Sequence, residues 1–158
     1  MKFELKVAKN GKGMAQNEAE SQLFGDYYLK DMGIFIPMID YDEGGNAPTW
    51  IHTEMATKAK QSKFKKETGG TLDEVMAYLR HIKDQRSSRR PQFGQVYKQP
   101  EHLNIESDLI SSLEDYIGNY DANINDYGRL ANWGVFNGNI VIIDAGLTDD
   151  VYASHYSP

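Results

Sequence analysis

Two residues whose side chains could bind a metal stand at the ends of a predicted β-hairpin in the segment Tyr127–Thr148. Asn132 precedes the hairpin, and Asp144 follows an apolar strand at residues 140–143. An amide oxygen and a carboxylate on one rigid hairpin can share a hard cation such as Mg²⁺, which keeps part of its water shell and bridges phosphates. The same pattern is typical of an ordinary hairpin with a polar end, so the spacing alone leaves both interpretations open.

Other motifs of catalysis and metal binding are absent from the sequence. The four histidines show no HxxH or HExxH spacing, and the chain has no Cys, so neither a zinc site nor a disulfide is expected. The patterns GxSxG, GxxxxGK[ST] and GxGxxG do not occur. Trp50 and Trp133 flank apolar strands and are expected in the core.

The net charge of −6 hides an asymmetry along the chain. Residues 1–100 carry 16 Lys and Arg against 13 Asp and Glu, a net of +3, whereas residues 101–158 carry one Arg against 10 acids, a net of −9. The segment 80–98 is basic and includes Phe93 and Tyr97, so it could bind phosphate or an RNA backbone. Basic segments are more commonly solvated or paired with acidic surface, so nucleic acid is not the expected partner. Its basic residues are Arg80, Lys83, Arg86, Arg89, Arg90 and Lys98.

Length and composition indicate one folded domain outside the membrane. A chain of 158 residues can bury about two-thirds of its unfolded surface. No apolar run approaches the ~20 residues that span a bilayer, and the first ten residues lack the apolar core of a signal peptide. The absence of Cys is compatible with a reducing compartment, and a cytoplasmic location is expected.

Hydrophobic periodicity predicts strands and one helix in the first part of the chain. Residues 2–9 alternate apolar and charged side chains, the period of a half-buried strand that places Lys6 on its charged face. A helix is expected over 14–30, an apolar strand over 34–40 and a return strand over 49–55.

The rest of the chain is predicted to be mainly helical before the final hairpin. A lysine-rich helix ends at Gly69-Gly70, and Thr71 caps the next helix, which runs to about residue 84. Residues 85–104 look like a long loop, and Ser107 caps a further helix. The hairpin then turns at Asn137-Gly138. The whole chain is expected to be a single α+β domain.

This order of parts resembles a compact protein-kinase-like fold, and specifically the small kinase-like proteins of bacteriophages. The first block that carries the resemblance is LKVAKNGKGMAQNEAE, and the second is NWGVFNGNIVIIDAGLT. The resemblance implies a truncated fold, with a small antiparallel sheet, packed helices and a carboxyl-terminal hairpin like a catalytic loop. Residues 1–56 would form the half with the strands and one helix, and residues 57–158 an abbreviated helical half.

The resemblance implies a metal site and a phosphate-binding lysine. Asp144 would occupy the position of the metal-binding Asp of the family's Asp-Phe-Gly, and Asn132 that of the catalytic-loop Asn. Lys6 would contact the phosphates, with Lys9 as the competitor if the strand is turned over. The cofactors implied are ATP and Mg²⁺.

Three further residues are carried over from the family pattern. Glu20 would be the helix residue that holds the lysine, with Glu18 as the alternative. Glu54 to Ala56 would form the hinge, where the backbone reads an adenine edge.

Departures from the family pattern weaken the enzymatic implication. Only five residues precede Lys6, so no glycine-rich loop is expected to cover the phosphates, and only 14 follow Asp144, so no activation segment or substrate platform is expected. The catalytic Asp expected at position 127 is a Tyr, and Asp126 is the candidate that could replace it.

The resulting hypothesis is a phage-type protein that binds ATP and Mg²⁺ in a degenerate cleft, with weak or no phosphotransfer. The alternatives are a pseudokinase that modulates a host protein, in the host cytoplasm, and a nucleic-acid-binding accessory protein acting through residues 80–98. The sequence does not indicate an oligomeric state.

Overall fold

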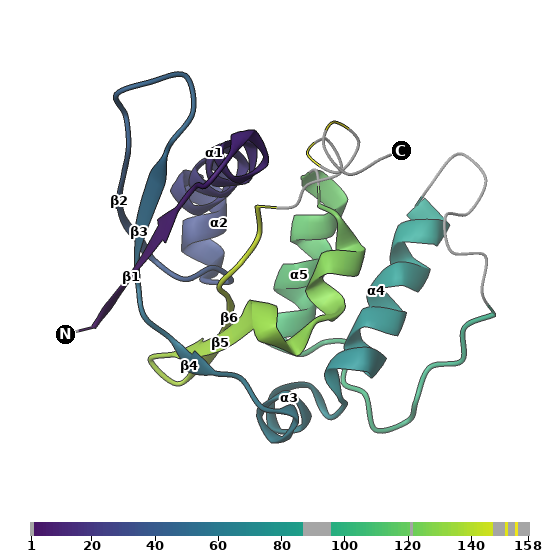
Figure 1. Cartoon of the computed structure of the whole chain (residues 1–158). Coiled ribbons are helices and arrows are strands. Elements are labelled where there is room, and N and C mark those ends of the chain that lie inside the picture. The colour runs from purple at the N-terminus through teal and green to yellow at the C-terminus, as the bar shows by residue number, and fades with distance from the viewer. Residues whose placement is uncertain (1, 87–95, 121, 147–150, 152–153, 155–158) are drawn as a thin grey trace.

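The protein is an α+β structure in which helices pack against two small antiparallel sheets, and the first of these sheets lies at one side of the molecule (Figure 1). The structure, a computed structural model, describes residues 2–86, 96–120, 122–146, 151 and 154. The predicted α+β class is therefore confirmed. In this part of the chain no helix combines the length and the apolar character needed to cross a bilayer.

The first sheet has the strand order β1-β3-β2 and is built from Phe3–Val7 (β1), Met38–Tyr41 (β2) and Trp50–Glu54 (β3). The pairing of β2 with β3 is interrupted by a bulge between Met38 and Asp40, whereas β1 pairs with β3 in regular register. One edge of this sheet is therefore irregular and the other regular.

Two helices, rather than the single predicted one, follow β1. They are α1 (Gly11–Gly25) and α2 (Tyr27–Met32). The side chain of Asn10 caps the start of α1 by accepting from the Gly13 N–H, at 3.0 Å. The break falls at Asp26, whose backbone is extended and whose carboxylate caps α2 through the Leu29 N–H, at 3.1 Å. This capping interaction competes with a continuous helix.

The orientation of β1 is opposite to the one that the alternating pattern suggested. Phe3, Leu5 and Val7 are exposed, whereas Glu4 and Lys6 lie on the inward side. The strand itself is confirmed, but the expectation that Lys6 lies on a solvated face is wrong. Lys6 is drawn inward because its ammonium group forms an ion pair with the buried Glu20 of α1.

The second sheet contains the hairpin that the sequence predicted. Thr57–Lys58 (β4) pairs with Trp133–Phe136 (β5), which pairs with Asn139–Ile142 (β6). Asn137 and Gly138 have φ values of 51° and 81°, the left-handed conformation that a type I′ turn requires. The turn is thus at the predicted position.

The second sheet is joined by main-chain hydrogen bonds to the segment that leads into β2. The Ile142 N–H donates to the Ile34 carbonyl at 2.7 Å, and the Ile36 N–H donates to the Ile142 carbonyl at 3.0 Å. Where the chain passes from β3 to β4, a Cβ built on Gly134 of β5 would lie 2.6 Å from the Cβ of Ala56, so these two segments approach closely. These contacts hold β6 against the segment that leads into β2.

Three further α-helices are described after the first sheet: α3 (Gln61–Thr68), α4 (Leu72–Arg86) and α5 (Asp108–Asn119). The predicted caps are confirmed. Gly69 ends α3 in a left-handed conformation, Thr71 and Glu74 form a capping box at the start of α4, and the Ser107 side chain accepts from the Ile110 N–H. Of the predicted loop over 85–104, residues 87–95 lie outside the described residues.

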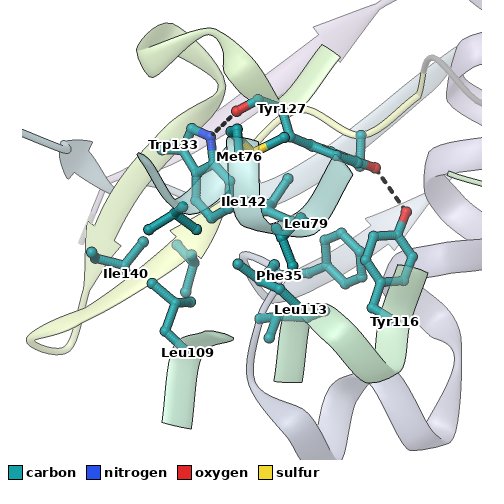
Figure 2. Close-up of a cluster of buried hydrophobic side chains, with 14 of the residues drawn as sticks. Phe35, Met76, Leu79, Leu109, Leu113, Tyr116, Tyr127, Trp133, Ile140 and Ile142 are labelled. Atoms are coloured by element: carbon teal, nitrogen blue, oxygen red, sulfur yellow. Dashed lines mark hydrogen bonds between the residues drawn. The ribbon is translucent and has the colours of Figure 1, made fainter. Parts of the chain in front are cut away.

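Two short 3₁₀ helices, η1 (Ile124–Gly128) and η2 (Leu130–Asn132), connect α5 to the hairpin. Together with α4, α5 and the second sheet they enclose the main hydrophobic core (Figure 2). Trp133 is 1% exposed within it, as expected, and its indole N–H donates to the Tyr127 carbonyl at 2.7 Å. Trp50, also expected in the core, instead lies half-buried on the outer face of the first sheet.

Candidate functional site

A buried carboxylate joins three distant segments of the chain. Glu20 of α1, with a side chain only 4% exposed, forms an ion pair with Lys6 of β1 through one oxygen. Its other oxygen accepts from the Ala145 N–H at 3.0 Å. The Lys6 ammonium also donates to the Ile143 carbonyl at 2.5 Å. One lysine and one glutamate thus connect β1, α1 and the segment that follows β6.

The local sequence explains why these groups meet. Lys6 points inward because it alternates with the exposed Leu5 and Val7, and Glu20 shares the buried side of α1 with Leu23 and Phe24. The ammonium of Lys6 lies 5.7 Å from the centre of the Phe24 ring, a cation–π distance.

The alternative residues for this pair are placed elsewhere. Lys9 is exposed at the end of the strand, and Glu18 is exposed on the outer side of α1. The choice of Lys6 and Glu20 therefore agrees with the geometry.

Gly146 allows the segment after β6 to pass directly beneath α1. A Cβ at this position would lie 2.6 Å from the Gln16 carbonyl oxygen, closer than such atoms approach in real proteins. In Figure 1 this segment runs upward from β6 between α2 and α5. The third residue of the Asp144-Ala145-Gly146 run is thus required for packing, a role that the sequence interpretation did not assign.

Asp144 is the exposed acid of this segment, and its charge acts on two neighbouring carboxyl groups. Burial raises the pKa of Glu20 from 4.5 to about 7, opposed by the Lys6 charge and assisted by that of Asp144. Burial, with the charge of Asp144 as the second cause, raises the pKa of Asp126 from 3.8 to about 6. Three carboxyl groups therefore interact electrostatically, which favours a cation or a proton among them.

Asn132 and Asp126 are held together beside this acidic group. The Asn132 amide nitrogen donates to the Asp126 backbone carbonyl at 2.7 Å and to its carboxylate at 3.2 Å. The Ile143 N–H donates to the Asn132 carbonyl at 2.9 Å, so Asn132 lies next to the residue that precedes Asp144. With its amide nitrogen engaged by Asp126, Asn132 has its side-chain oxygen left to offer a cation.

The candidate donors for a magnesium ion are the carboxylate of Asp144, which is exposed, and the side-chain oxygen of Asn132, a residue that is 6% exposed. Within the described ranges, His, Asp and Glu side chains form no group of three or more that could hold a metal unaided. Mg²⁺ does not need such a cage, because it commonly binds one or two protein oxygens together with phosphates and water. The carboxylate of Asp144 and the amide oxygen of Asn132 are oxygen donors of this type.

Position 127, where the family pattern expects the catalytic Asp, belongs to the core. Tyr127 is 3% exposed, and its hydroxyl lies 2.7 Å from that of Tyr116 (Figure 2). Burial raises the pKa of its hydroxyl well above 10. Tyr127 therefore supplies no carboxylate at this position, and the role suggested for Asp126 stays a prediction.

A surface hollow of about 390 Å³ lies beside the Lys6–Glu20 pair. Its walls include Lys6, Glu20 and Asp144. Its rim is formed by the turn before α1 and the first turn of this helix, a contribution that the sequence interpretation missed. The rim residues include Lys9, Asn10, Lys12 and Gly13.

The remaining predicted site residues are not among those that line this hollow. Asp126 and Asn132 are not among the described residues that line it, although the charge of Asp144 reaches Asp126. Glu54 and Ala56 lie where the chain passes from the first sheet to the second, and also outside the lining. The Glu54 N–H donates to the Pro37 carbonyl at 3.0 Å.

Comparison with known proteins finds no matching family model, no matching curated protein and no matching solved structure. The functional interpretation therefore depends on the residues and geometry of this chain.

Proposed function

We propose that the hollow beside Lys6 binds ATP with Mg²⁺ in a kinase-like arrangement, and that the protein transfers phosphate weakly or not at all. The observation that carries this proposal is the Lys6–Glu20 pair, which is anchored to the Ala145 N–H next to Asp144. A lysine held by a buried glutamate, beside an exposed carboxylate, provides charges of both signs for a nucleotide–metal complex.

The charged pair and the two candidate metal ligands each have a role in this proposal. Lys6 contacts the phosphates, and Glu20 positions the lysine. Asp144 and Asn132 would hold Mg²⁺, which would supply positive charge to neutralise the phosphates. The backbone between Glu54 and Ala56, which the resemblance assigned to the adenine edge, does not line this hollow, so the proposal gives it no contact with the ligand.

Nucleotide binding without efficient phosphate transfer is favoured because position 127 carries a buried Tyr in place of a catalytic Asp. Tyr127 is a core residue, and Asp126 is engaged by Asn132 through a hydrogen bond. A pseudokinase that modulates a host protein is therefore the second candidate. The phage-type relationship remains a proposal that is based on the resemblance.

The nucleic-acid alternative has less support in the described residues. Arg86 forms an ion pair with Glu114 at 2.7 Å, and the Lys83 ammonium donates to the Ala122 carbonyl at 3.2 Å. Both side chains thus pair with the carboxyl-terminal half, as basic segments commonly do. Arg89 and Arg90 lie outside the described residues.

Thermal unfolding with ATP, with and without Mg²⁺, tests nucleotide binding. At a ligand concentration of a hundred times the Kd, binding stabilises the protein by ~2.7 kcal/mol, or about 5–10 °C in Tm for a domain of this size. The Asp144→Asn variant should lose the magnesium-dependent part of the shift, whereas the exposed-site control Asp115→Asn should keep it. No shift in the wild type, or an unchanged shift in Asp144→Asn, would refute the assignment.

Transfer is tested separately from binding. Release of phosphate from ATP is compared between the wild type and the Asp126→Asn variant under saturating nucleotide. We expect a low rate in the wild type and a lower one in the variant. Equal rates would exclude Asp126 as the general base and leave the binding function standing.

A further inference from the structure

The regular edge of the first sheet carries an exposed apolar strand. Phe3, Leu5 and Val7 of β1 are 44%, 61% and 62% exposed. They share the outer face of the sheet with Trp50 and His52 of β3, and a shallow hollow of about 360 Å³ lies over Leu5, Val7, Trp50 and His52. Protein surfaces seldom leave such a cluster uncovered on an edge strand.

The backbone of β1 also presents unpaired edge positions. Ala8 donates to the Thr49 carbonyl at 2.8 Å, so the main-chain groups of Ala8, and by alternation those of Lys6 and Glu4, face β3. The main-chain N–H and C=O groups of Phe3, Leu5 and Val7 consequently point away from the sheet. Among the described strands only β3 pairs with β1, and this edge has no bulge, unlike the β2 edge.

We propose that β1 pairs edge to edge with β1 of a second copy of this chain, antiparallel and centred on Leu5. In this register Leu5 faces Leu5 of the other copy, and Phe3 faces its Val7. The residues whose main-chain groups point away from β3 then lie opposite one another, as a hydrogen-bonded antiparallel pair requires. Together they form about six main-chain hydrogen bonds. The two sheets become one sheet of twice the width.

The charges of β1 select this partner and this register. Centring the pair on Leu5 places Glu4 opposite Lys6 of the second copy on both sides of the axis. The Lys6 ammonium keeps its ion pair with Glu20, so Glu4 adds an attraction at longer range. Moving the centre to Glu4 would oppose two glutamates, and moving it to Lys6 would oppose two lysines, both of which are unfavourable. The strand FELKV is thus complementary to itself when antiparallel, which favours a second copy over an unrelated strand.

Sedimentation velocity on residues 1–158 over a wide range of concentrations tests the dimer. We expect a reversible monomer–dimer equilibrium in the wild type. Leu5→Pro should abolish it, because the Leu5 N–H points away from β3 and its loss removes no hydrogen bond within the sheet. Leu5→Val, which keeps this N–H and the strand preference, is the matched control and should still dimerise.

A second variant keeps the test decisive if Leu5→Pro does not fold. Glu4→Lys places two lysines opposite each other at both ends of the pair and should weaken the dimer at least tenfold. Hydrogen exchange followed by NMR then locates the contact. The amides of Leu5 and Val7 should become protected as concentration rises, whereas those of Glu4 and Lys6 should be protected at every concentration.

Three results would overturn the proposal. They are a wild type that stays monomeric at the highest concentration, a dimer that both variants leave intact, and Leu5 and Val7 amides whose exchange does not depend on concentration. Protection of these amides only when a different apolar strand peptide is added would assign the edge to another protein. All measurements are made without nucleotide, so their failure leaves the proposed ATP binding unaffected.

Discussion

Replacing Lys6 by methionine should destabilise the protein in a manner that depends on pH. The substitution removes the cation that faces Glu20, a carboxyl group whose side chain is only 4% exposed. Breaking one partner of a buried ion pair costs ~3–5 kcal/mol, because the other charge remains buried without compensation. This is a large part of the ~5–15 kcal/mol by which domains are stable.

The sign of the pH dependence follows from the raised pKa of Glu20. In the folded wild type this pKa is about 7, against 4.5 ordinarily, so between these values the folded state binds more protons than the unfolded state. The contribution of Glu20 to stability is therefore present below about pH 4.5 and is lost as the pH rises towards 7, by ~3 kcal/mol in total. Without Lys6, which lowers this pKa, the loss should extend to higher pH.

Urea unfolding of the wild type and Lys6→Met at pH 5, 6, 7 and 8 measures this effect. The difference in the free energy of unfolding should be smallest at pH 5, where Glu20 is largely protonated, and should grow by up to ~1.4 kcal/mol at pH 8, one pH unit above the folded-state pKa of about 7. The double variant Lys6→Met/Glu20→Gln should lose this pH dependence, and the exposed-lysine control Lys65→Met should behave as the wild type. An equal difference at pH 5 and pH 8 would refute the buried-pair reasoning.

Three other substitutions test separate parts of the structure. Asp144→Asn should lower the pKa of Asp126 below about 6, because the charge of Asp144 helps to raise this pKa. NMR titration of the Asp126 carboxyl carbon measures the pKa, and an unchanged value would contradict the electrostatic interaction between the two carboxyl groups. Tyr116→Phe should cost ~1–3 kcal/mol in urea unfolding, because the buried Tyr127 hydroxyl loses its 2.7 Å partner, and Tyr116→Phe/Tyr127→Phe should recover part of this loss. Gly146→Ala should cost ~1–3 kcal/mol in the same assay, because the new Cβ would lie 2.6 Å from a carbonyl oxygen of α1; a neutral result would show that the backbone shifts freely there.

Local chemistry made much of the fold predictable from the sequence. The Asn137-Gly138 turn, the Ser107 cap and the Gly69 helix end each depend on a few adjacent residues, so the sequence contains the whole signal. Helix periodicity places Glu20 on the buried side of α1, whereas strand periodicity alone put Lys6 on the face away from the core. The resemblance supplied the expectation that they meet.

What the sequence did not reveal depends on contacts between distant segments. Alternation in β1 gives a period of two but does not say which face is covered, and the buried Glu20 turned the strand so that Leu5 is outside. The helix predicted over 14–30 divides because Asp26 caps a new helix, a choice that periodicity cannot detect. Trp50 is half-buried on the outer face because it follows the same inversion of the sheet.

The main-chain bonds of Ile142 to both Ile34 and Ile36 have a mechanical consequence. They connect the hairpin to the segment leading into the first sheet. Swinging the hairpin away from the first sheet would break these hydrogen bonds, so such a motion carries an energetic cost.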